Sequence, residues 1–179
     1  VAFHTDNGIY APTLETAATV KTSVQVLSDA GVAVEENRPK AIERGHEIYF
    51  GLSGADGGAG LQKYLQMVGS KELSPSLQQS LRLLHLQSLS TTDLLGLMVE
   101  WDMWRSKILT FMDNYDVILC PASAYPAPPH GVATRLGSNN AFSYTSTYNI
   151  AGWPAVVVRA GTSPEGLPIG VQVVARPWR

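Results

Sequence analysis

Hydrophobic and polar residues follow two different periods along this chain, and the local period indicates where strands and helices form. Two β-branched runs stand near the end, at residues 155–158 and 169–174, with turn-forming residues 162–166 between them. This order predicts a hairpin, whose first strand has the composition of a strand buried on both faces. A short polar-aromatic helix is predicted before it, over residues 143–150. Gly152 should end that helix with a positive φ, and Pro154 prevents its return.

The first 35 residues read as strand, helix and strand. Residues 1–3 are a short apolar strand, and a helix over residues 14–30 carries Leu14, Val24 and Leu27 on one face and ends at Gly31. A strand over residues 32–35 completes a βαβ unit with parallel strands. The predicted fold class is α/β, with a mixed β-sheet flanked by helices. Its strands are expected at residues 1–3, 32–35, 116–119, 155–158 and 170–174, with the helix over residues 14–30 packed on one face.

The middle of the chain has helical periodicity interrupted by glycines. Helices are predicted over residues 43–52, 61–68, 76–89 and 92–114. The glycine run over residues 53–60 has two interpretations. A phosphate-binding loop would need a complete GxGxxG after a strand, or a P-loop lysine, and the run has neither. A flexible joint between helices is the better supported interpretation. The wide apolar face of the last helix favours packing in a core over lying on a membrane, since its polar face is nearly neutral.

Composition narrows the class of protein. The chain has 179 residues, 45% of them hydrophobic and 16% charged, with a formal net charge of −2, which is typical of one globular domain. No run of like charges suggests nucleic acid, and no apolar run is long enough to span a membrane. The single cysteine excludes an internal disulfide and suits a reducing compartment, so we predict a cytoplasmic location. The chain opens within a strand at Val1 without an initiator Met, which indicates a piece of a longer protein.

Residues that could carry chemistry are few. Cys120 and His130 could form a nucleophile and base, but a lone cysteine at a strand end is more often a small buried hydrophobe. The four histidines have no metal-ligand spacing, and neither G-x-S-x-G nor S-x-x-K occurs. The sequence therefore predicts no catalytic residue, no cofactor and no metal within this chain.

A long ordered pattern points to a family. The segment NIAGWPAVVV, followed by GLPIGVQVVARPW, resembles the C-terminal part of the amidase signature family, as do the VAFHTD opening and the Tyr115-Asp116 pair before Pro121. The resemblance implies a serine hydrolase of amide bonds. In this family a Ser nucleophile, a bridging Ser in a cis peptide and a Lys base lie in the N-terminal half, and no Gly-Ser-Ser occurs here. It further implies one domain over residues 1–179, with a helical insertion at about residues 40–114.

The resemblance also implies a wall of the substrate pocket. The residues that match are Tyr144, Thr145, Tyr148 and, more weakly, Trp153; the alternative is that these aromatic side chains pack the core. The expected partners are a small-molecule amide and the missing N-terminal half. By itself the chain should be inactive and should self-associate, for example as a homodimer. Its ending is nearer to the fatty-acid amide hydrolases and general amidases. Part of the amidase-like subunit of a tRNA-dependent amidotransferase, or a non-catalytic binding or scaffolding domain, remains an alternative.

Overall fold

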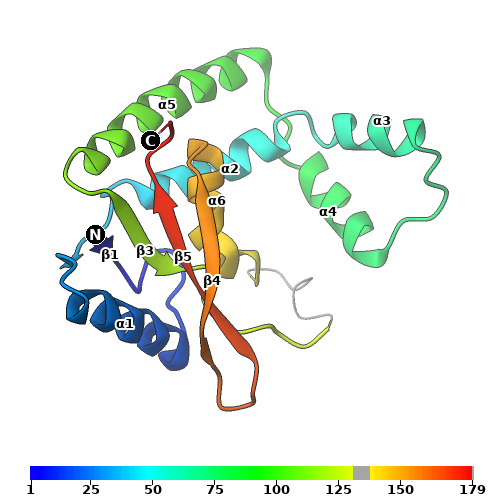
Figure 1. Ribbon diagram of the computed structural model, residues 1–179. Coiled ribbons are helices and arrows are strands. Elements are labelled where there is room, and N and C mark those ends of the chain that lie inside the picture. Colours follow the sequence, from blue (N-terminus) through cyan, green and yellow to red (C-terminus); the bar gives the residue numbers. More distant parts are fainter. Residues whose placement is uncertain (131–137, 179) are drawn as a thin grey trace. The chain divides into compact units, whose positions relative to one another are not determined.

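The computed structural model describes residues 1–130 and 138–178, with the side chains of residues 138 and 139 excepted. The chain divides into two compact units, drawn with the rest of the chain in Figure 1. One comprises Val1–His46 and Trp104–Arg179, and contains the sheet; the other is Glu47–Met103 and is helical. The boundaries between them fall within two helices, α2 (Ile42–Gly54) and α5 (Thr91–Leu109).

A mixed sheet forms the centre of the first unit. Within the described residues it has five strands in the order β2-β1-β3-β5-β4. β1 is parallel to β2 and β3, whereas β5 is antiparallel to β3 and β4. These pairings confirm the predicted single mixed sheet, the parallel βαβ start and the C-terminal hairpin. The strand bounds are Ala2–Phe3 for β1, Glu35–Glu36 for β2, Val117–Pro121 for β3, Ala155–Thr162 for β4 and Pro168–Ala175 for β5.

The second strand begins later than the sequence predicts. Instead of residues 32–35, β2 is Glu35–Glu36. The N–H of Val32 donates to the carbonyl of Leu27 at 3.0 Å, so Val32 still belongs to the end of the preceding helix. The carbonyl of Ala33 accepts from the terminal ammonium of Val1 at 2.7 Å. These bonds occupy the backbone before residue 35, and the ladder with β1 starts only there.

The prediction that residues 155–158 are buried on both faces is wrong for this structure. β4 is the outermost strand of the sheet, and Val156, Val157 and Val158 keep 56%, 53% and 52% of their surface exposed. The β-branched run gave the strand correctly, because that composition suits a pleated backbone. Burial depends instead on what covers the strand, and the described residues place no strand on the outer side of β4.

Helix α1 (Leu14–Asp29) lies against β3, β4 and β5, as Figure 1 shows in blue. Val20 and Val24 form a buried cluster with Leu119 of β3 and Val171 of β5. The predicted apolar face is partly wrong, since Leu14 is 88% exposed at the start of the helix. Thr16 and Thr19 face the sheet instead; the Thr19 hydroxyl is satisfied by donating to the carbonyl of Glu15 at 2.8 Å, which makes its burial inexpensive.

Helix α6 (Ser143–Ala151) follows a 3₁₀ turn over Ser138–Phe142 and ends as the sequence predicts. Gly152 has a φ of +74°. Its N–H donates to the carbonyl of Asn149, and the N–H of Trp153 donates to the carbonyl of Tyr148, both at 3.1 Å. This pair of bonds is the Schellman arrangement, which requires a left-handed residue at the first position and therefore favours glycine.

Replacing Gly152 should destabilise the fold because of that backbone conformation. Gly152→Val is expected to lower the free energy of unfolding by about 1 kcal/mol or more, since a β-branched residue is strained at a positive φ. Gly152→Asn is the matched control, because asparagine tolerates this region. Urea denaturation of the three proteins measures the effect. Equal stability of the valine and asparagine variants would contradict the role assigned to this glycine.

The remaining helices are α3 (Ala59–Met67) and α4 (Pro75–His85), and α5 continues into a 3₁₀ turn over Thr110–Asp113. The glycine run joins α2 to α3, with Gly57 and Gly58 at positive φ. The carboxylate of Asp56 accepts from the N–H groups of Gly58 and Gly60 at 2.8 and 2.7 Å. A side chain of the chain itself thus occupies amides that a phosphate-binding loop would offer, as a joint between helices allows. None of the described helices combines the length and the apolarity needed to cross a bilayer.

Candidate functional site

The predicted substrate residues lie on α6 and directly after it, on one face of the sheet. Because side chains alternate along strands, Leu119 and Val171 face α1 while Cys120 and Gln172, paired across β3 and β5, face the other side. The amide of Gln172 donates to the carbonyl of Tyr144 at 3.1 Å and to the sulfur of Cys120 at 3.4 Å. These bonds attach α6 to the middle of the sheet.

His4 contributes a buried ring to the same layer. It follows β1 directly, and its Nε2 lies 3.1 Å from the hydroxyl of Tyr148, while its ring stacks on that of Tyr144 with centroids 6.4 Å apart. Burial lowers the pKa of His4 to about 4, and the positive charge of Arg38 acts in the same direction. The ring is therefore neutral at pH 7. Its Nδ1 has no hydrogen-bond partner among the described residues.

Three of the four predicted substrate residues have buried side chains. Tyr144 is 1% exposed, and its hydroxyl donates to the carbonyls of Thr5 and Tyr10 at 3.2 and 2.8 Å. Tyr148 and Trp153 are 2% and 7% exposed, and their rings stack with centroids 5.9 Å apart. Burial raises the pKa of both tyrosines, so the phenols act as neutral hydrogen-bonding groups.

Thr145 has the most accessible position of the four. It is partly exposed, and its hydroxyl donates to the carbonyl of Phe142 at 3.0 Å, within the first turn of α6. The structure thus brings Tyr144, Tyr148 and Trp153 together as one aromatic layer, with Thr145 at its accessible edge. Their contact with a substrate stays a prediction.

Cys120 has none of the properties of a nucleophile. Its side chain is fully buried, and burial raises the pKa of its thiol to about 12, so it stays protonated at neutral pH. His130, the candidate base, is exposed. The small buried hydrophobe is the interpretation that this geometry supports. Among the described residues, no group of three or more His, Cys, Asp or Glu side chains could hold a metal ion.

Sequence reasoning missed the polar contacts that fix the other side of α6. Asn7 donates to the hydroxyl of Ser143 at 2.7 Å, and Nδ1 of His46 lies 3.3 Å from the hydroxyl of Ser146. Both serines are buried. The signal available was the spacing of the serines, because two small polar residues three apart share one face of a helix.

An α/β unit with a mixed sheet and an aromatic, hydrogen-bonded helix on one face is the class that this geometry defines. The chain belongs to the amidase family, whose model matches residues 1–179.

Known proteins of this family resemble the whole chain or a part of it. The chain is 26% identical to fatty acid amide hydrolase 1 of Caenorhabditis elegans over 234 aligned residues, which cover 100% of this chain and 40% of that protein. A glutamyl-tRNA(Gln) amidotransferase of Xanthobacter autotrophicus has a polypeptide that is 37% identical, over only 38% of this chain and 14% of that polypeptide.

Solved structures share the fold. A 6-aminohexanoate cyclic dimer hydrolase and a fatty acid amide hydrolase each align with a TM-score of 0.81 at 20% identity. Each alignment covers 99% of this chain, and 41% and 36% of those two chains. The chain thus spans about 40% of the length of the hydrolases that it matches end to end.

Proposed function

We propose that this chain is the C-terminal part of a serine amidase that hydrolyses carboxylic amide bonds. The family match over residues 1–179 is the observation that carries the proposal. In it, the chain supplies sheet core and a wall of the substrate pocket, while an N-terminal segment supplies the Ser–cis-Ser–Lys triad. The greater length of the relatives supports this division, as does the lack of a Gly-Ser-Ser in the sequence.

The outer strand supports the same proposal. β4 exposes Val156, Val157 and Val158 in a row, although such a composition is typical of a strand covered on both faces. We propose that the catalytic segment covers this strand in the full enzyme. Without it, an exposed apolar edge favours association between copies, so a homodimer is the expected state of the isolated chain.

Other features of the proposal follow the same reasoning. A small-molecule amide is the substrate class, and we propose a cytoplasmic location because the only cysteine is a buried thiol. One domain with a helical insertion at about residues 40–114 remains our proposed organisation. The amidotransferase alternative rests on a match to 38% of the chain, whereas a fatty acid amide hydrolase matches all of it. A non-catalytic binding domain remains the alternative if no catalytic segment exists.

The 179-residue chain by itself is expected to have no amidase activity. Amide hydrolysis needs an activated nucleophile, a base within hydrogen-bond reach and donors for the developing oxyanion. Assays on aryl amides and acyl amides should therefore give the buffer background, and light scattering should show self-association. Turnover that Cys120→Ala abolishes would contradict the proposal. The complementary experiment expresses the chain together with the coding sequence upstream of Val1, whose product should hydrolyse amides.

Thr145 gives a test of the pocket wall in such an active protein. Thr145→Trp should raise KM for bulky amides more than for small ones and leave kcat for small amides unchanged, because a filled pocket excludes large ligands selectively. Thr22→Trp, at an exposed position of α1, is the matched control. Steady-state kinetics with a short and a long acyl amide measures the ratio. An equal effect on both substrates would place Thr145 away from the pocket.

A further inference from the structure

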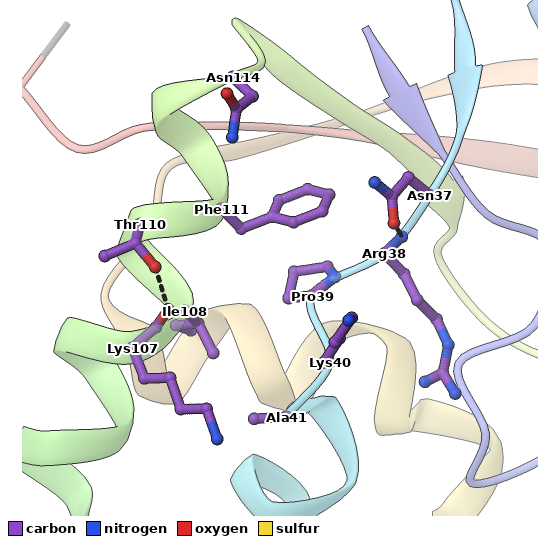
Figure 2. Close-up of a pocket in the computed structure, with 10 residues that line it drawn as sticks. All are labelled: Asn37, Arg38, Pro39, Lys40, Ala41, Lys107, Ile108, Thr110, Phe111 and Asn114. Carbon is purple, nitrogen blue, oxygen red and sulfur yellow. Dashed lines mark hydrogen bonds between the residues drawn. The ribbon is translucent and has the colours of Figure 1, made fainter.

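A cavity of about 320 Å³ lies between the loop that precedes α2 and the end of α5, within the sheet-containing unit. Residues 37–41 form one wall, and side chains between Lys107 and Asn114 form the other. Figure 2 shows the Phe111 ring and the Pro39 ring at its centre, with the Lys107 side chain extending towards Ala41. None of its lining residues is among the predicted substrate residues.

Two lysines give the cavity its charge. Lys40 and Lys107 both line it, and neither has a carboxylate partner among the described residues. The third cation, Arg38, is already committed, since it pairs with Glu43 at 2.8 Å and donates to the carbonyl of Asn7. Its guanidinium is turned away from Phe111 in Figure 2. No Asp or Glu occurs among the described residues that line the cavity, so two positive charges there are uncompensated.

The start of α2 adds to the positive potential. Ala41 lines the cavity, and its carbonyl accepts from the N–H of Gly45 at 3.3 Å, which is the first bond of the helix. The N–H groups of the first turn have no intrahelical acceptor, and the helix dipole makes this end positive. An anion placed between the two lysines would therefore lie near a third source of positive charge.

The opposite wall is apolar. Ile108 is 2% exposed, Pro39 is buried, and Phe111 stacks on Tyr115 with ring centroids 4.8 Å apart, which fixes the orientation of its ring. Inorganic anions would use only the cationic side of such a cavity. A ligand with an anionic head and a flat apolar body would use both sides and gain the burial of its apolar surface.

We propose that this cavity binds a small carboxylic acid, with the carboxylate between Lys40 and Lys107 and the apolar body against Phe111 and Pro39. The lysines supply charge-assisted hydrogen bonds, and the aromatic and proline rings supply the apolar contact. The site is independent of the amidase proposal, because it requires neither a catalytic segment nor turnover.

Titration of the 179-residue chain with benzoate at low ionic strength tests the site, followed by amide chemical shifts and by calorimetry. Binding is expected with a dissociation constant on the order of 1 mM, a usual affinity for a ligand of this size. Shifts should concentrate at Lys40, Ala41, Lys107 and Phe111. Benzamide, the uncharged analogue, and inorganic phosphate, the anion without an apolar body, should each bind about tenfold more weakly or less.

Three variants locate the charge. Lys40→Gln and Lys107→Gln should each weaken benzoate binding about tenfold, by removing one charge-assisted hydrogen bond. Lys21→Gln, an exposed lysine of α1 outside the cavity, should leave it unchanged. All three replace exposed side chains, so each variant should keep the spectrum of the folded chain. No saturable benzoate binding, equal weakening by Lys21→Gln, or phosphate binding as tight as benzoate would each overturn the proposal.

Discussion

Lowering the pH from about 7 to about 4 is expected to cost the folded chain roughly 3 kcal/mol of stability through His4 alone. In the unfolded chain this histidine takes up a proton near its usual pKa of 6.5, whereas in the folded chain burial lowers its pKa to about 4. Between these values the unfolded state binds more protons than the folded state. The stability contributed by neutral His4 is thus fully present above pH 6.5 and is lost as the pH falls towards 4.

His4→Gln isolates this effect. Glutamine can still offer a polar group towards the hydroxyl of Tyr148, which lies 3.1 Å from Nε2 of His4, but it cannot take up a proton. Chemical denaturation at several pH values should give a steeper loss of stability for the original chain than for the variant between pH 6.5 and 4. Parallel curves would show that His4 is not held neutral. Acidic groups such as Asp56, whose pKa is lowered by the N–H groups of Gly60 and Gly58, act in both proteins and cancel.

Gly45→Ala is expected to lower the free energy of unfolding by about 2 to 3 kcal/mol, although alanine is the better helix former. Gly45 lies in α2 against the ring of Trp104, and a methyl group there would overlap the ring, with Cε2 2.7 Å away. The ring cannot move aside cheaply. It is 4% exposed, and its Nε1 donates to the carbonyl of Ala41 at 2.7 Å. Any displacement exchanges a steric clash for a lost hydrogen bond.

Gly96→Ala provides the control, because a methyl group at Gly96, within α5, would meet no atom within 4 Å. That substitution should stabilise the chain by up to about 1 kcal/mol through helix propensity alone. Thermal and urea denaturation of both variants measures the contrast in sign. A Gly45→Ala protein that is stabilised like the Gly96 variant would mean that Trp104 does not pack on Gly45.

The sequence predicted the features whose causes are local. Gly152 and Pro154 announce the end of α6 because the Schellman arrangement and the proline restriction act within a few residues. The hairpin of β4 and β5 follows from two runs and the turn between them. Features decided by distant parts of the chain were missed. The exposure of β4 depends on what lies beside it, and Leu14 points to solvent because Thr16 and Thr19 face the sheet.

The candidate site shows the same division. Tyr144, Tyr148 and Trp153 were selected through a resemblance, and the structure places them in one layer. Their buried partners could not be predicted, because His4 and Tyr148 are 144 residues apart and nothing in their local sequence connects them. Likewise Gln172 reads as an isolated polar residue in a strand, although its amide joins β5 to α6 and to Cys120.

The central position of β1 has a consequence for how this chain can change in evolution. β1 pairs with β2, about 30 residues away, and with β3, more than 100 residues away, and the helical unit Glu47–Met103 lies between β2 and β3 in the sequence. The entropy of closing such a long loop grows only with the logarithm of its length, so doubling it costs about 0.6 kcal/mol. Insertions between β2 and β3 therefore cost the sheet little. The alignment with the Caenorhabditis elegans hydrolase extends over 234 residues although this chain has 179, so the family has accepted length changes that a loop of this kind permits.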